Sequence, residues 1–144
     1  ITDTQMAYHK TKEQMANLEG YLHPTPGLKE FLTKLKQTKK LVLVTNSEED
    51  DVKRLLAFLG LDEIFDDVVT SAYKPTNTKK HFADILKRYD VKSEQALSIG
   101  DNFMNEVAPA LQMGMYGIWL TTSHEVPVED EHFAKIKTLA NITY

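Results

Sequence analysis

The chain repeats one pattern, in which a short apolar run is followed by a segment whose apolar residues follow helical spacing. Clear apolar runs stand at 41–44, 96–99 and 115–120, and a shorter run lies at 67–70. Continuous apolar runs of this length are typical of parallel strands that are covered on both faces. Their alternation with helical segments indicates an α/β fold, in which a parallel sheet lies between helices.

The helical segments divide the chain into two parts of unequal size. Residues 2–19 have the composition of a helix but only a thin apolar face, so we expect residues 1–19 to be a helical cap remnant or a linker. Residues 20–144 are expected to form the α/β core. The helices predicted within the core lie at 28–35, 52–59, 77–89 and 103–113, and a last helical pattern runs through Phe133, Ile136 and Leu139.

The composition of the chain argues against several kinds of binding partner and bears on its cellular compartment. The net charge is -4 and no basic stripe is visible, so nothing favours binding to nucleic acid. The chain has no cysteine, which excludes disulfides and thiolate metal sites and suits the cytoplasm. No apolar run approaches the roughly 20 residues of a membrane span. The five histidines show no metal-ligand spacing and are expected on the surface or in the core.

Two acids mark the end of the apolar run at 96–99. Asp101 directly follows Gly100, and Glu106 lies in the first turns of the next predicted helix. Ligands of open α/β sheets bind beyond the carboxyl ends of the strands, and two carboxylates there suit a hard cation such as Mg2+. The alternative interpretation is structural, because Asp101 or Asn102 would also serve as a helix cap.

Two other strand ends carry groups that suit an anion. Thr45 and Asn46 lead into a helix whose free N–H groups could bind an anion, although Ser47 as a plain helix cap explains the same pattern. Lys74 precedes Pro75, which disfavours helical backbone, and its charge could neutralise carboxylate or phosphate oxygens. The alternative for Lys74 is the solvated position that most lysines take.

In this order and spacing, Thr45-Asn46, Lys74-Pro75 and Gly100-Asp101-x-x-x-x-Glu106 resemble the haloacid dehalogenase-like (HAD) hydrolase superfamily, over about residues 21–120. The resemblance implies a Rossmann-like three-layer sandwich and a Mg2+-dependent phosphatase that acts on a small phosphorylated metabolite. It implies that Thr45 and Asn46 bind the phosphoryl group and that Lys74 steadies the nucleophile and the phosphoryl oxygens. It also implies that Asp101 binds Mg2+.

The sequence departs from the family pattern in two ways. Glu106 stands where Asp is usual, so its longer side chain suits a water-mediated contact with the metal or a pairing with Lys74. The first motif, an apolar strand ending in Asp-x-Asp, is missing, and no apolar strand precedes Asp3. Because that strand lies in the middle of the family's sheet, its absence would leave two open inner edges.

The missing motif leads to three further expectations. We expect a preceding segment, or self-association, to complete the sheet. We expect the aspartate that forms the aspartyl-phosphate to lie outside this chain, so that the 144 residues alone are inactive. The leading hypothesis is then a phosphatase, although dehalogenases and phosphomutases belong to the same superfamily.

Two other functions are compatible with the sequence. A non-catalytic HAD-like module that binds a phosphorylated ligand or a partner protein would also lack the first motif. A response-regulator-like or other flavodoxin-like domain places acids and a lysine at strand ends too. The acidic pair expected after the first strand of such a domain is missing here.

Overall fold

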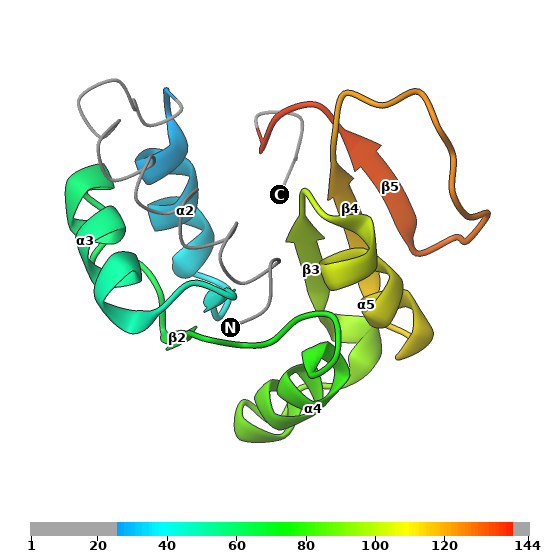
Figure 1. Ribbon diagram of the computed structural model, residues 1–144, viewed down its shortest axis with the longest axis horizontal. Helices are drawn as coiled ribbons and strands as arrows, with labels where there is room; N and C mark the ends of the chain where they lie inside the picture. The colour runs from blue at the N-terminus through cyan, green and yellow to red at the C-terminus, as the bar shows by residue number, and fades with distance from the viewer. Residues whose placement is uncertain (1–25, 140–144) are drawn as a thin grey trace, which may run out of the picture.

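The computed structural model describes residues 26–139 (Figure 1). Its elements, in chain order, are α2 (Leu28–Lys36), β1 (Val42–Val44), α3 (Glu49–Leu59), β2 (Asp67–Val69), α4 (Thr78–Arg88), the 3-10 turn η2 (Ser93–Gln95), β3 (Leu97–Gly100), the π-helical turn η3 (Phe103–Val107), α5 (Ala108–Gln112), β4 (Tyr116–Leu120) and β5 (Phe133–Ile136). Strands and helices alternate from α2 to β4, as predicted. The helix predicted for residues 2–19 lies outside the described residues.

All the strand pairs are parallel, and they form two sheets. In one sheet β1 pairs with β2, with Val44 beside Val69. In the other sheet the order is β3-β4-β5, with Ile99 beside Ile118. Parallel strands joined by helices confirm the predicted α/β class. Among the described residues no strand lies between β1 and β3, so each of these two strands keeps one open edge.

The strand β5 shows that the last predicted helix is wrong. Phe133 pairs with Gly117 and Ile136 pairs with Leu120 in a parallel ladder. The spacing of the apolar residues in this segment fits a helix, but the free edge of β4 offers main-chain hydrogen bonds that override the local pattern. Phe133 also packs edge-on against Phe103 of η3, with 5.8 Å between the ring centroids. The segment therefore extends the sheet.

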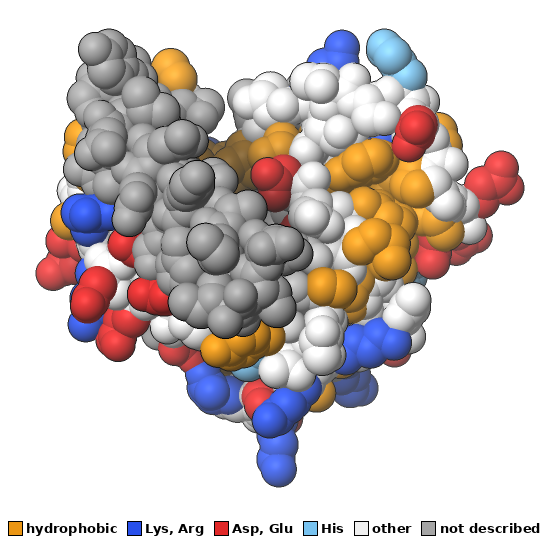
Figure 2. All heavy atoms as spheres, viewed as in Figure 1, with side chains coloured by type: hydrophobic (Ala, Val, Ile, Leu, Met, Phe, Trp, Pro, Cys, Tyr) orange, Lys and Arg blue, Asp and Glu red, His pale blue; other side chains and the backbone are white. Residues whose placement is uncertain are grey.

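A cavity of about 750 Å³ separates the inner edges of the two sheets, and we call it the slot. Its walls are β1 and β3, and apolar side chains of α4 also line it. The β1 side chains are only half-buried, and Leu97 of β3 is 47% exposed, whereas a strand inside a parallel sheet is covered. The prediction of a buried strand at 96–99 is thus only partly right. Figure 2 shows a notch at the top of the molecule, with hydrophobic side chains inside it.

One cluster of buried residues lies between α4, α5 and the start of β4. Phe82, Ala110 and Met115 are buried together, and half-buried apolar residues such as Val44 and Ile85 pack against them. α4 contacts α5, and α5 packs on β4. α2 and α3 lie on the other side of the molecule, beside the first sheet (Figure 1). Val44 thus joins the first sheet to the cluster beside the second sheet.

Glycines end two of the elements as the sequence indicates. Gly60 ends α3 with φ of 71°, and Gly114 follows α5 with φ of 81°, a conformation in which other residues are strained. Within residues 26–139 no helix is both long enough and apolar enough to cross a membrane.

Candidate functional site

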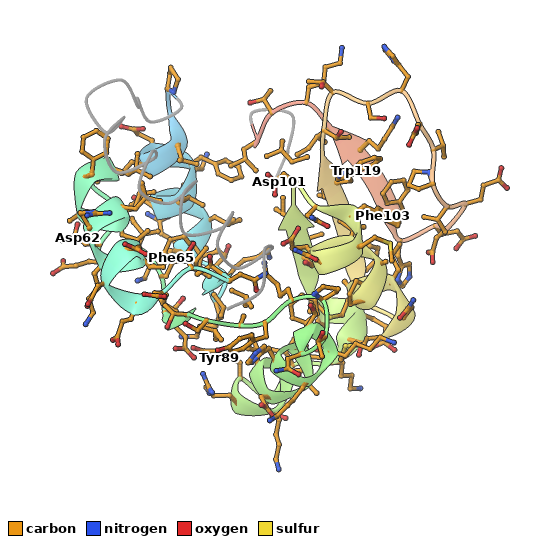
Figure 3. The ribbon with its side chains drawn as sticks, viewed as in Figure 1. Asp62, Phe65, Tyr89, Asp101, Phe103 and Trp119 are labelled. Carbon is orange, nitrogen blue, oxygen red and sulfur yellow. The ribbon has the colours of Figure 1, made fainter. Side chains whose placement is uncertain are left out.

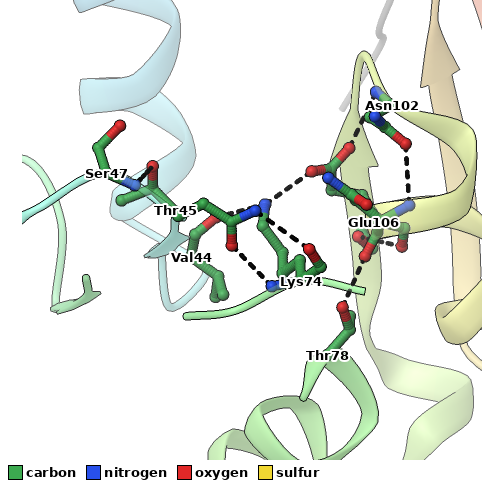
Figure 4. Close-up of polar contacts among 10 residues, drawn as sticks. Val44, Thr45, Ser47, Lys74, Thr78, Asn102 and Glu106 are labelled. Carbon is green, nitrogen blue, oxygen red and sulfur yellow. Dashed lines mark hydrogen bonds and ion pairs between the residues drawn. The ribbon is translucent and has the colours of Figure 1, made fainter. Parts of the chain in front are cut away.

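The side chains selected from the sequence meet at one end of the slot. Thr45 follows β1, Lys74 lies in the loop after β2, and Asp101 follows β3; all three line the slot, together with Glu106 of η3. The carboxyl ends of parallel strands lie at the same edge of a sheet, so this meeting follows from the topology. Figure 4 shows the polar contacts that connect these strand ends.

Lys74 spans the end of the slot from one sheet to the other. Its ammonium donates to the carbonyl oxygen of Val44 at 2.8 Å and to Oε1 of Glu106 at 2.6 Å. The two charged side chains are only 8% and 13% exposed, so solvent screens this ion pair little. An ammonium has three donors, and the described residues accept two of them. One N–H of Lys74 is left for a ligand in the slot.

Glu106 connects Lys74 to the loop that carries Asp101. While Oε1 pairs with Lys74, Oε2 accepts a hydrogen bond from the backbone N–H of Asn102 at 2.9 Å. The carboxylate also lies flat against Gly100, where a Cβ would be 2.5 Å from Oε2. Both oxygens therefore have protein partners, which favours a positioning role over direct metal ligation.

The turn that carries Glu106 is a π-helix, supported by two buried hydroxyls. The N–H of Ala108 bonds to the carbonyl of Phe103, five residues back. Thr78 donates to the carbonyl of Asn105 at 2.8 Å, and Ser98 donates to the carbonyl of Glu106 at 2.9 Å. Single π-turns occur often at functional sites. These two are the buried polar residues of the described chain, and both hold η3.

Asp101 presents an exposed carboxylate on a loop that is held on two sides. Asn102 is the N-cap of η3 and accepts from the N–H of Asn105, so the cap predicted for Asp101 or Asn102 belongs to Asn102. Trp119 donates its indole N–H to the carbonyl of Asp101 at 3.1 Å. Among residues 26–139 the carboxylate itself has no hydrogen bond or ion pair. It is therefore available to a cation (Figure 3).

Thr45 and Ser47 form a tight turn after β1. The hydroxyl of Thr45 accepts from the N–H of Ser47 at 3.1 Å, and its own proton has no acceptor within the described part of the chain. Ser47 does not cap α3, because the N-cap position is Glu48 and no side chain caps it. The helix-cap explanation for Ser47 is wrong, and Thr45, which lines the slot, keeps the donor of its hydroxyl.

The donor set is compatible with Mg2+ but incomplete within the described residues. Between residues 26 and 139 there is no group of three His, Cys, Asp or Glu side chains that could hold a metal ion. Mg2+ is usually held by one or two carboxylates together with waters and substrate phosphates. Asp101 fits the role of one such carboxylate, and Glu106 fits a contact through water.

Sequence reasoning missed three residues that hold the site. Ser98 gave a signal, because it is the only polar residue within the apolar run at 96–99 and is buried. Thr78 and Trp119 gave none, because a helix-start threonine and a strand tryptophan are explained by local structure alone. Their roles depend on contacts that are distant in sequence.

Known proteins resemble this chain in sequence and in fold. A family model described as haloacid dehalogenase-like hydrolase matches residues 2–114. The chain belongs to the HAD-like hydrolases. A curated relative, a glyceraldehyde 3-phosphate phosphatase of Pyrococcus furiosus, is 28% identical over 79% of this chain and 46% of its own length. The HAD-like chain spans about half the length of the curated relatives it matches.

Solved HAD structures share the fold. A HAD phosphatase from Thermococcus onnurineus superposes with a TM-score of 0.70 and 25% identity, over 90% of this chain and 61% of that one. A putative HAD-hydrolase of Bacillus subtilis, solved bound to magnesium, gives a TM-score of 0.65 and 21% identity, over 80% of this chain and 51% of that one. The second likeness concerns the fold alone.

Proposed function

We propose that this chain supplies the phosphate-positioning part of a Mg2+-dependent HAD phosphatase that hydrolyses small phosphomonoesters. The observation that carries the proposal is the meeting of Thr45, Lys74 and Asp101 at one end of the slot. They bring a hydroxyl donor, a largely buried ammonium and an exposed carboxylate to one place. A doubly charged phosphoryl group and a cation both find partners there.

Each of the three groups has a distinct task. The Thr45 hydroxyl and the backbone N–H groups that follow it donate to phosphoryl oxygens, and Asn46 contributes to the same phosphate-binding segment. The ammonium of Lys74 stabilises the charge on those oxygens as the transition state forms. Asp101 would hold Mg2+ and Glu106 would support it through water, and the bound ion would supply charge screening between nucleophile and phosphate.

The nucleophile is an aspartate outside this chain, carried by a strand that enters the slot. One of its carboxylate oxygens attacks phosphorus, while the bond to the alcohol oxygen breaks and that oxygen takes a proton from a general acid. Water then attacks the aspartyl-phosphate and releases phosphate. Support comes from the open edges of β1 and β3, whose unpaired main chain is suited to receive an extended segment.

We infer that the substrate is a small phosphorylated metabolite. The Thr45 hydroxyl and the Lys74 ammonium offer donors for one phosphoryl group. The name of the curated relatives makes glyceraldehyde 3-phosphate a substrate to test first. A panel of other sugar and triose phosphates, and a generic phosphomonoester, completes the comparison.

The experiment is Mg2+-dependent release of phosphate by the natural gene product, with Lys74→Ala and Lys79→Ala as a matched pair. Lys79 is an exposed lysine at the start of α4. We expect turnover to fall at least about a hundredfold in Lys74→Ala and to stay unchanged in Lys79→Ala. Equal turnover in both variants, or full activity in a metal chelator, would overturn the proposal.

A second candidate function is a non-catalytic module that binds a phosphorylated ligand or a partner protein. The engagement of both Glu106 oxygens and the missing Asp-x-Asp motif favour it. The natural gene product would then bind phosphate or vanadate in a manner that depends on Lys74, and would release no phosphate from any ester.

A further inference from the structure

The side chain of Asn46 holds the backbone of Lys74 through two hydrogen bonds. Its Oδ1 accepts from the N–H of Lys74 at 2.7 Å, and its Nδ2 donates to the carbonyl oxygen of Lys74 at 3.1 Å. The primary amide thus pairs with residue 74 as a neighbouring strand would. Both contacts are partly buried and join positions 28 residues apart.

The loop held in this way is strained. Ser71 and Tyr73 have φ of 47° and 54°, in the left-handed region that non-glycine residues rarely adopt. Tyr73 is 71% exposed, so packing of its own side chain does not keep the backbone in this conformation. The N–H of Ala72 bonds to the carbonyl of Thr45, and the carbonyl of Tyr73 accepts from the N–H of Asn77. The N–H and the carbonyl of Lys74 itself are held by Asn46.

The position of the Lys74 ammonium depends on that loop. A lysine side chain is flexible and loses much rotamer freedom when its ammonium is held in one place. The ammonium reaches Val44 and Glu106 at the same time only while the Cα of Lys74 stays close to the end of β1. A small displacement of the loop would break one of these contacts.

We propose that Asn46 is a positioning residue, whose side-chain amide clamps the backbone of residue 74 and thereby sets the place of the Lys74 ammonium at the end of the slot. Its catalytic consequence rests on the proposed function, because it assumes that Lys74 acts on the phosphoryl group. The clamp itself is independent of any activity. A phosphate oxygen would then bind the backbone N–H groups that follow Thr45. The side-chain amide of Asn46 would bind the backbone of Lys74 instead of the phosphate.

Amine labelling of the natural gene product tests the clamp. The variants are Asn46→Ala, which removes both hydrogen bonds, and Asn46→Asp, which keeps the acceptor and removes the donor. The matched control is Asn77→Ala, because Asn77 sits three residues from Lys74 and its side chain caps nothing. The rate of acylation by an amine-reactive ester is followed for Lys74 and for exposed Lys79 across a range of pH.

We expect Lys74 to react more slowly than Lys79 in the parent chain, since its ammonium is bound and only 8% exposed. Asn46→Ala should raise the Lys74 rate about tenfold, the change that corresponds to the loss of one to two net hydrogen bonds in the closed loop. Asn46→Asp should raise it by less, and Asn77→Ala should leave it unchanged. The Lys79 rate should not respond to any of them.

Two results would overturn the clamp. One is a Lys74 rate and pH profile in Asn46→Ala that match those of Asn77→Ala. The other is a Lys74 rate that rises equally in Ile85→Val, a core variant that lowers stability without touching the loop. In the second case general loosening, and not the clamp, would explain the labelling.

Turnover of the natural gene product separates the clamp from the proposed function. If both hold, Asn46→Ala lowers kcat with little change in KM, and Lys74→Ala lowers it further. If Asn46→Ala raises the labelling of Lys74 while Lys74→Ala leaves turnover intact, the clamp stands and the catalytic role of Lys74 fails.

Discussion

Gly100 and Glu106 lie so close that a Cβ on residue 100 would be 2.5 Å from Oε2 of Glu106 and 2.7 Å from its Cβ. Because Gly100 has no side chain, the carboxylate of Glu106 can lie against the end of β3. Gly100→Ala should force η3 away from the strand end and lower the free energy of unfolding by about 1–3 kcal/mol, as overpacking does. Urea denaturation of the 144-residue chain measures this change. A urea midpoint equal to that of the parent chain would contradict this prediction, because it would mean that η3 can move away from Gly100 without a loss of stability.

The ion pair between Lys74 and Glu106 should be strongly coupled. Removing one partner leaves the other charge largely buried, so Lys74→Met and Glu106→Gln should each cost roughly 3 kcal/mol of stability. The double variant should cost little more than either single one, with a coupling free energy of about 2 kcal/mol. A double-mutant cycle in urea measures it.

The exposed pair of Lys53 and Glu49 serves as the control for that cycle. Its atoms are 3.0 Å apart, but the side chains are 71% and 67% exposed. Its coupling should be below about 0.5 kcal/mol and should fall with salt. Equal coupling in the two pairs would mean that burial does not strengthen the contact of Lys74 with Glu106.

The buried hydroxyl of Thr78 should contribute to stability through the π-turn. Thr78→Val keeps the shape but leaves the carbonyl of Asn105 without its donor, which should cost about 1–3 kcal/mol. Thr76→Val, at an exposed position two residues earlier, should change stability by less than about 0.5 kcal/mol. Thermal or urea unfolding of both variants gives the comparison, and equal effects would contradict a role for the hydroxyl.

Asp101→Asn should abolish turnover without changing the stability of the fold. The carboxylate has no partner among the described residues, so the unfolding free energy should stay within about 0.5 kcal/mol of the parent. The natural gene product should lose its Mg2+-dependent turnover, because an amide binds Mg2+ more weakly than a carboxylate. Retained turnover at the same Mg2+ concentration would remove Asp101 from the metal site.

The sequence predicts the elements that obey local rules. Apolar runs and helical stripes placed β1, α3, α4 and β4, because these signals act within a few residues. β5 was missed, since the edge of β4 decides its conformation. The same reason explains why the first turn after β3 was expected as an ordinary helix, when Thr78 and Ser98 support a π-turn there.

In the candidate site, too, some features could be predicted from the sequence and others could not. Thr45, Lys74 and Asp101 were selected because each follows a predicted strand, and the topology brings the carboxyl ends of the strands together. The contacts that hold them were not predictable, because Asn46 meets Lys74 and Trp119 meets Asp101 only in the folded chain. Residue type and spacing therefore indicate which groups meet, and only the structure shows how each is held.

The most direct test of the account is to fill the slot. A synthetic peptide of apolar residues that ends in Asp-x-Asp is added to the 144-residue chain, and phosphate release from a phosphomonoester is measured with Mg2+. A peptide ending in Asn-x-Asp is the control. We predict no turnover by the chain alone, turnover with the first peptide, and binding without turnover for the second. Turnover by the chain alone, or equal turnover with both peptides, would contradict a nucleophile supplied through the slot.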